Sequence, residues 1–123
     1  GDWVGSGHSH GEPMSGHLHV STILDGSWLE AIETLKDKSG KPTLADRTFY
    51  RFDSDNDALQ AVQFIEHAHM SVHTVELIEG GFRWITGPGA PQLHFHQTDD
   101  GFAYTVQTEN EDAPCVQMTY MRA

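Results

Sequence analysis

Residues 16–24 read GHLHVSTIL and alternate between two kinds of side chain. Successive side chains of a β-strand point to opposite faces, so this stretch places His17 and His19 on one face and Leu18 and Val20 on the other. The alternation predicts a strand over residues 17–24 with an apolar face toward a core and a histidine face turned away from it.

A second stretch, residues 92–98, reads QLHFHQT and repeats this pattern. His94 and His96 share one face of the expected strand, and Leu93 and Phe95 share the other. The chain has nine histidines, and all but one of them belong to His-x-His pairs. Repetition on a second strand makes the histidine faces the main functional signal of the sequence.

Two segments carry the signs of helices. Ser27 and Glu30 have the spacing of a capping box, and the apolar residues that follow repeat at helical spacing through residues 28–38. The acid-rich residues 54–57 precede a second apolar stripe that ends near Met70. We therefore expect two helices in the first half of the chain.

Further alternating stretches predict strands over residues 47–53, 71–79, 82–86, 92–98, 102–108 and 114–121. With residues 17–24, they indicate an α+β fold. We expect one antiparallel or mixed sheet with two helices on one face, arranged as a ferredoxin-like core with extra C-terminal strands. Residues 1–16, rich in Gly and His, are expected to form an arm before a single α+β domain at residues 17–123.

The charge balance limits the classes of partner. The 123-residue chain has 18 Asp and Glu against 7 Lys and Arg, a formal charge of −11 with neutral histidines. A surface this acidic disfavours nucleic acid and anionic membranes, and it suits metal cations or a basic protein partner. No signal peptide or membrane-spanning segment is visible in this chain, and the sequence leaves the compartment open.

The histidine pairs predict a divalent transition-metal site. Two imidazoles on one strand can reach one ion, and two such strands, adjacent or one apart, can bring four nitrogens together. Such ligands suit Zn first, and also Ni, Cu or Fe. The expected function is metal sensing, storage or delivery. The candidate ligands are four histidines and two acids: His17, His19, His94, His96, Asp100 and Glu12.

The segment 91–104, PQLHFHQTDDGFAY, resembles the first metal motif of the cupin family, in which His-x-His is followed by an acid and an aromatic strand. The resemblance implies a small barrel with His94, His96 and Asp100 as metal ligands. The acid is Asp where the family has Glu, and no histidine follows the segment. This gives one alternative function, a small metal-dependent enzyme with Tyr104, Glu12 or Asp100 as acid or base.

A second alternative needs no metal. The acidic surface would act as an interaction or inhibitor domain for a basic protein, with the histidines incidental or sensitive to pH. The sequence leaves these three functions open.

Overall fold

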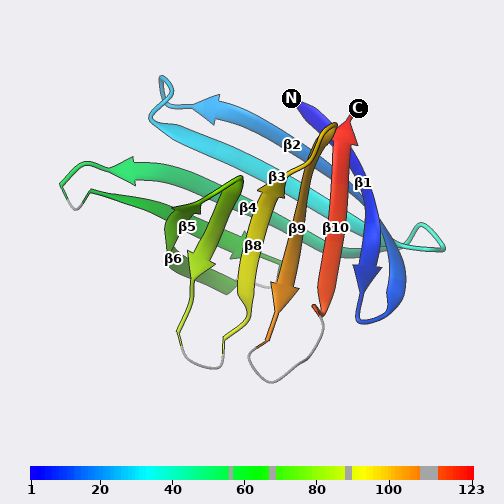
Figure 1. Ribbon diagram of the computed structural model, residues 1–123. Helices are drawn as coiled ribbons and strands as arrows, with labels where there is room; N and C mark the ends of the chain where they lie inside the picture. Colours follow the sequence, from blue (N-terminus) through cyan, green and yellow to red (C-terminus); the bar gives the residue numbers. More distant parts are fainter. Residues whose placement is uncertain (56, 67–68, 88–89, 109–113) are drawn as a thin grey trace.

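The computed structural model describes residues 1–55, 57–66, 69–87, 90–108 and 114–123. These residues form ten β-strands and no helix, and the strands close into one antiparallel barrel (Figure 1). The strands are β1 Asp2–Ser9, β2 Glu12–Ile23, β3 Trp28–Asp37, β4 Pro42–Asp53, β5 Ala58–Ile65, β6 His69–Ile78, β7 Gly81–Ile85, β8 Gln92–Gln97, β9 Gly101–Gln107 and β10 Val116–Arg122.

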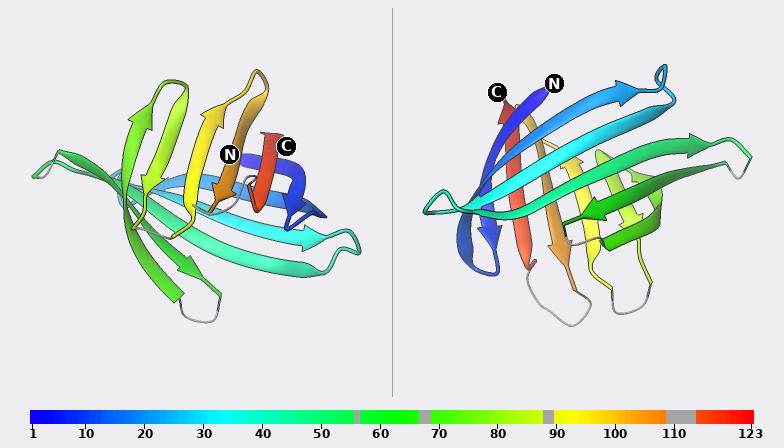
Figure 2. Two further views of the ribbon diagram at one scale, coloured as in Figure 1. Left: turned by 60° about the horizontal axis from the view of Figure 1, so that its bottom comes forward. Right: turned by 180° about the vertical axis from the view of Figure 1, so that it is seen from behind.

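The barrel follows the chain order around its circumference. Each strand pairs with its neighbours in sequence, and β1 closes the ring by pairing antiparallel with β10, with Trp3 opposite Arg122. The two termini therefore lie side by side, and the Ala123 amide donates to the Asp2 carbonyl at 3.0 Å (Figure 1). The long strands β2 to β4 form the wall opposite β8 to β10 (Figure 2). Closure satisfies the ladder hydrogen bonds that an open sheet would leave at its edges.

The expected α+β fold, with its ferredoxin-like core and two helices, is wrong. The first expected helix, residues 28–38, is replaced by β3, whose inward side chains include Leu29, Ala31 and Leu35. The buried acid Glu33 also points inward, so the apolar residues of this strand do not alternate regularly in the sequence. Ile32 on the outer face, together with Leu29 and Leu35, gives the spacing that is typical of an apolar helix face. Pairing with β2 and β4 decides the conformation.

The second expected helix is also replaced by strands, β5 and the beginning of β6. Its acid-rich start instead makes the β4–β5 turn, in which the Asp55 amide donates to the Asp53 carboxylate at 3.1 Å and Asp57 has a φ of 49°. Asp and Asn side chains stabilise turns and helix caps by similar hydrogen bonds, so the acid-rich residues 54–57 are compatible with a turn as well as with the start of a helix. Asn56, with residues 67–68 of the expected helix, lies outside the described residues.

Residues 1–16, which we expected to form an arm, make β1 and the first part of β2. The two strands meet in a tight turn where His10 and Gly11 have φ values of 49° and 81°, as in the favoured two-residue hairpins. Glycine in this segment suggested an arm, but Gly5 is needed because its strand packs closely against β10. A Cβ on Gly5 would lie 2.8 Å from both the Thr119 carbonyl and the Tyr120 ring.

The expected strands of the second half are confirmed as β6 to β10, with bounds that differ by one or two residues. They pair in sequence order as an antiparallel meander. Residues 109–113, which read ENEDA, lie outside the described residues. Among the described residues there is no helix of the length and apolar character needed to cross a membrane.

The core consists of two clusters on the inner wall of the barrel. The larger joins β1 to β4 with β8 to β10 around Met118 and Tyr120, both fully buried. The smaller surrounds Ala61, Val75 and Trp84 on β5 to β7. The strand expected over residues 17–24 is confirmed through Ile23, where β2 ends, and Leu24 lies exposed in the turn that follows. The strand supplies Leu18 and Val20 to the inner wall and leaves the histidines outside.

Candidate functional site

The interior of the barrel encloses a cavity of about 930 Å³. Most of its wall is apolar, and the side chains that form it come from strands all around the ring. Aliphatic residues such as Leu18, Ala31 and Leu35 lie on one side, and aromatic residues such as Trp84 and Phe95 lie on the other. The aromatic rings support one another, since Phe82 and Phe95 are stacked with centroids 4.4 Å apart. The inner wall is therefore a preformed apolar surface.

The rim of the cavity is polar and mainly acidic. At one end of the barrel it includes Glu12 at the start of β2, Asp37 at the end of β3, and His10 in the turn between β1 and β2. His96, which pairs with Gly81 at the start of β7, lines the cavity toward the other end. Glu12 and His96, which we predicted as metal ligands, thus line the cavity toward opposite ends of the barrel.

A cluster of acids and tyrosines interrupts the apolar wall. The Tyr104 hydroxyl donates to the two oxygens of the buried Glu33 carboxyl, at 3.0 and 2.9 Å, and the Tyr120 hydroxyl donates to Oε2 at 2.5 Å. Asp46, directly opposite Glu33 on the neighbouring strand β4, hydrogen-bonds to the same carboxyl. Three strands besides β3 therefore hold one carboxyl group in place.

Burial controls the protonation of the acid pair. Desolvation raises the pKa of Glu33, although the donors Tyr120 and Tyr104 act in the opposite direction by stabilising its anion. Desolvation, followed by the charge of Glu33, raises the pKa of Asp46 from 3.8 to about 8. Since Glu33 accepts two hydroxyl protons, we place the anion on Glu33 and the shared proton on Asp46 near neutral pH.

Two glycines make room for Tyr120. Gly5 on β1 and Gly16 on β2 are directly paired, and the Tyr120 ring lies against the first of them. A Cβ on Gly16 would overlap the Tyr120 hydroxyl. The absence of both side chains allows the Tyr120 ring to reach from β10 across β1 and β2 toward Glu33 on β3.

On the other side of the cavity, Trp84 is 4% exposed, and its indole Nε1 has no hydrogen-bond acceptor within hydrogen-bonding geometry among the described residues. Burial raises the pKa of the Tyr50 hydroxyl, and the Trp84 side chain lowers it in part. His73 stacks on Trp84 with ring centroids 4.9 Å apart, and burial lowers the pKa of His73. The cavity therefore contains a polar donor as well as a carboxyl cluster.

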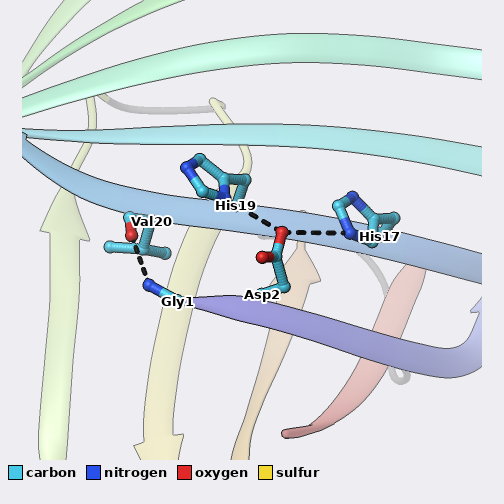
Figure 3. Close-up of polar contacts among 5 residues, drawn as sticks. All are labelled: Gly1, Asp2, His17, His19 and Val20. Carbon is cyan, nitrogen blue, oxygen red and sulfur yellow. Dashed lines mark hydrogen bonds and ion pairs between the residues drawn. The ribbon is translucent and has the colours of Figure 1, made fainter. Parts of the chain in front are cut away.

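The histidines His17 and His19 lie on the outer face of β2, with side chains 55% and 45% exposed. Both contact the carboxylate of Asp2 on β1. Oδ1 of Asp2 lies 2.9 Å from Nδ1 of His19 and 3.3 Å from Nε2 of His17 (Figure 3). The hydrogen bond with His19, more than the charges nearby, lowers the pKa of Asp2. Sequence reasoning did not identify Asp2, because it expected an arm there.

The second pair lies elsewhere. His94 and His96 belong to β8, and β1, β10 and β9 separate that strand from β2 on the shorter way around the ring. His94 pairs with Arg83 and Thr105 on the neighbouring strands, and Asp100 is exposed in the β8–β9 turn. The structure does not bring the two histidine pairs together. Among the described residues, no group of three or more His, Cys, Asp or Glu side chains is arranged to hold a metal ion.

Of the residues in the acid–tyrosine cluster, sequence reasoning nominated only Tyr104, as an acid or base. Glu33, Asp46 and Tyr120 were missed. A signal existed for Glu33, since an acid stands where the two-residue period of Leu29, Ala31 and Leu35 requires an inward residue. No protein-family model matches the chain, and no curated protein shows significant similarity to it. The geometry of the barrel therefore carries the functional argument.

Proposed function

We propose that this protein binds a small, largely apolar molecule inside its β-barrel. The observation that carries the proposal is the interior cavity of about 930 Å³, with an apolar, aromatic wall and one localised polar cluster. Small-molecule sites typically have volumes of roughly 300–1,000 Å³, apolar walls and a few placed polar groups. Barrels of similar strand number commonly hold one small ligand in this way.

Packing supports the same proposal. Protein interiors are close-packed, and voids much larger than a water molecule are few. A cavity of this size withholds van der Waals partners from the side chains around it, and each lost contact weakens the fold. A wall of stacked aromatic rings around such a space is consistent with a ligand that supplies those contacts.

A fluorescence titration tests the proposal. A neutral fluorophore that brightens in apolar surroundings should bind at one site per chain. Ala31→Phe, which adds a ring inside the cavity, should weaken binding by at least about tenfold, since overfilling costs roughly 1–3 kcal/mol. Thr34→Phe on the outer face of the same strand is the matched control. Absence of binding, or equal loss in both variants, would overturn the proposal.

Divalent-metal binding by strand histidines is a second candidate function. It is favoured by one observation, the approach of His17, His19 and Asp2 around a single carboxylate oxygen (Figure 3). These three residues offer two nitrogens and one oxygen, a ligand set that Zn accepts. In the structure these three side chains are not arranged to hold a metal ion, so a metal would have to replace the present contacts between Asp2 and the histidines.

Calorimetric titration of the metal-stripped protein with Zn tests this second function. Binding at the micromolar level or tighter that is lost in His17→Ala/His19→Ala would support it. The matched double variant His94→Ala/His96→Ala should retain that binding, because its residues lie on a distant strand. Equal effects of the two variants would contradict this location. Docking of a basic protein partner stays a prediction from the charge, tested by a pull-down that high salt abolishes.

A further inference from the structure

We propose that the ligand of this barrel carries a protonated amine on an apolar body, and that Glu33 and Asp46 bind the amine. This inference rests on the proposed function, because it names the class of molecule that the cavity takes. It is carried by three features of the cavity: the sign of its charge, an incompletely neutralised carboxylate, and the aromatic rings beside it.

The first feature is charge. Glu33 and Asp46 face the cavity, and Glu12 and Asp37 stand at its rim. No Lys or Arg lines the cavity within the described part of the chain. An anionic amphiphile such as a fatty acid would have to place its carboxylate beside like charges in a poorly solvated space. The acidic rim and the overall charge of −11 instead attract cations.

The second feature is the buried carboxylate itself. Glu33 is 7% exposed and receives hydrogen bonds from Tyr104, Tyr120 and Asp46, but the described residues bring no cation into contact with it. Hydrogen bonds reduce the cost of burying a charge, and an opposite charge reduces it further. A ligand ammonium group supplies that charge together with up to three N–H donors, which Glu33 and Asp46 can accept.

The third feature is the aromatic wall. The rings of Tyr50, Phe82, Trp84, Phe95 and Phe102 face the same cavity. Aromatic faces attract cations, and they also offer a broad apolar surface to the rest of the ligand. The buried Trp84 Nε1, without an acceptor among the described residues, adds a donor that an oxygen of the ligand or of a bound water would satisfy.

Binding of a cation should also release a proton. An ammonium group beside the acid pair favours the doubly ionised pair, so Asp46 loses the proton that it holds near neutral pH. The other titratable groups that contact the pair or line its cavity come from several strands: Asp37, Tyr50, Tyr104, Tyr120, His10, Glu12 and His96. The three tyrosines stay protonated because burial raises the pKa of each.

Three probes with one apolar body test the inference. Phenylbutylamine, phenylbutanol and phenylbutanoate should compete with the neutral fluorophore at pH 7 in that order of affinity. A charged hydrogen bond is worth about 1 kcal/mol more than a neutral one, so the amine should bind at least about fivefold more tightly than the alcohol. The carboxylate should bind more weakly than the alcohol.

Two variants assign the effect to the acid pair. Glu33→Gln and Asp46→Asn keep the shape of the side chains, and each should reduce the preference for amine over alcohol to about threefold or less. The fluorophore, measured on the same samples, reports whether each variant has kept a folded cavity. Glu30→Gln, a carboxyl on the same strand that ion-pairs with Arg47 outside the cavity, should leave the preference unchanged.

The outcomes separate the two proposals. If neither the fluorophore nor any probe binds, the proposed function fails, and this inference fails with it. If the fluorophore and the alcohol bind but the amine has no advantage, or if the carboxylate binds best, only the amine inference fails. Retention of the full amine preference in both Glu33→Gln and Asp46→Asn would also overturn it.

Discussion

The Tyr120 hydroxyl on β10 donates to the Glu33 carboxyl on β3 at 2.5 Å, although 87 positions separate the two residues in sequence. Two strands, β1 and β2, lie between them in the sheet. The hydrogen bond therefore spans the interior and ties the C-terminal strand to the first half of the chain. It also fixes the orientation of the acid around which the cavity is organised.

Loss of this hydroxyl should weaken the fold. Tyr120→Phe leaves a buried carboxylate with one donor fewer, and hydrogen bonds to charged groups contribute roughly 1.5–3 kcal/mol. Denaturant unfolding should show a loss of that size. NMR titration should show a further rise in the pKa of Glu33, since a donor that stabilises its anion is gone. Tyr50→Phe removes a hydroxyl that does not contact Glu33, and it should not shift this pKa comparably.

Gly16 should tolerate no side chain. Because a Cβ there would overlap the Tyr120 hydroxyl, Gly16→Ala should displace Tyr120 and reduce the free energy of unfolding by about 1–3 kcal/mol, a typical cost of overpacking. Ser15→Ala, at the exposed neighbouring position on β2, should change it by less than about 0.5 kcal/mol. Equal stability of the two variants would show that Tyr120 does not occupy this place.

The tight turn between β1 and β2 provides a test of whether residues 1–16 belong to the barrel. Gly11 has a φ of 81°, so Gly11→Ala forces an L side chain into the left-handed region and should cost about 1 kcal/mol of stability. Gly87→Ala is the control, since Gly87 has open space around its Cα and no positive φ. If residues 1–16 formed a disordered arm, neither Gly11→Ala nor Gly87→Ala would change the thermal unfolding temperature.

Stability should decline with pH between about 4 and 8. The pKa of Asp46 is raised from 3.8 to about 8 in the folded state, so its protonation favours the fold. That contribution is complete below pH 4 and is lost as pH rises through 8, with a slope of up to about 1.4 kcal/mol per pH unit. Asp46→Asn should show a flatter profile over this range. An unchanged slope in Asp46→Asn would mean that Asp46 is ionised in the folded protein.

The local alternation of apolar residues was enough to predict the strands of the second half and the inward direction of Leu18. It was insufficient for β3, because Glu33 takes an inward place in an otherwise apolar series. The acid at this inward position led to the wrong prediction of a helix. The same residue is the centre of the candidate site. Sequence patterns often mislead at functional positions, where local preference and function conflict.

The metal hypothesis illustrates a different limit. The direction of the histidine side chains followed from strand geometry, but the distance between the two pairs depends on how many strands separate them. Ring order in a barrel is a property of the whole chain, and no single stretch contains it. Asp2, which contacts His17 and His19, was unpredictable for the same reason, since pairing of β1 with β2 brings it there.

The most direct test of the central claim is an NMR measurement of where a bound apolar probe lies. With phenylbutanol bound, intermolecular NOEs should connect its ring to the inward side chains of Leu18, Ala31 and Leu35. They should be absent for Met70 and Val72, apolar side chains that are 62% and 57% exposed on the outside of β6. Contacts confined to Met70 and Val72 would contradict the account, because the probe would then occupy the surface of the barrel instead of its interior.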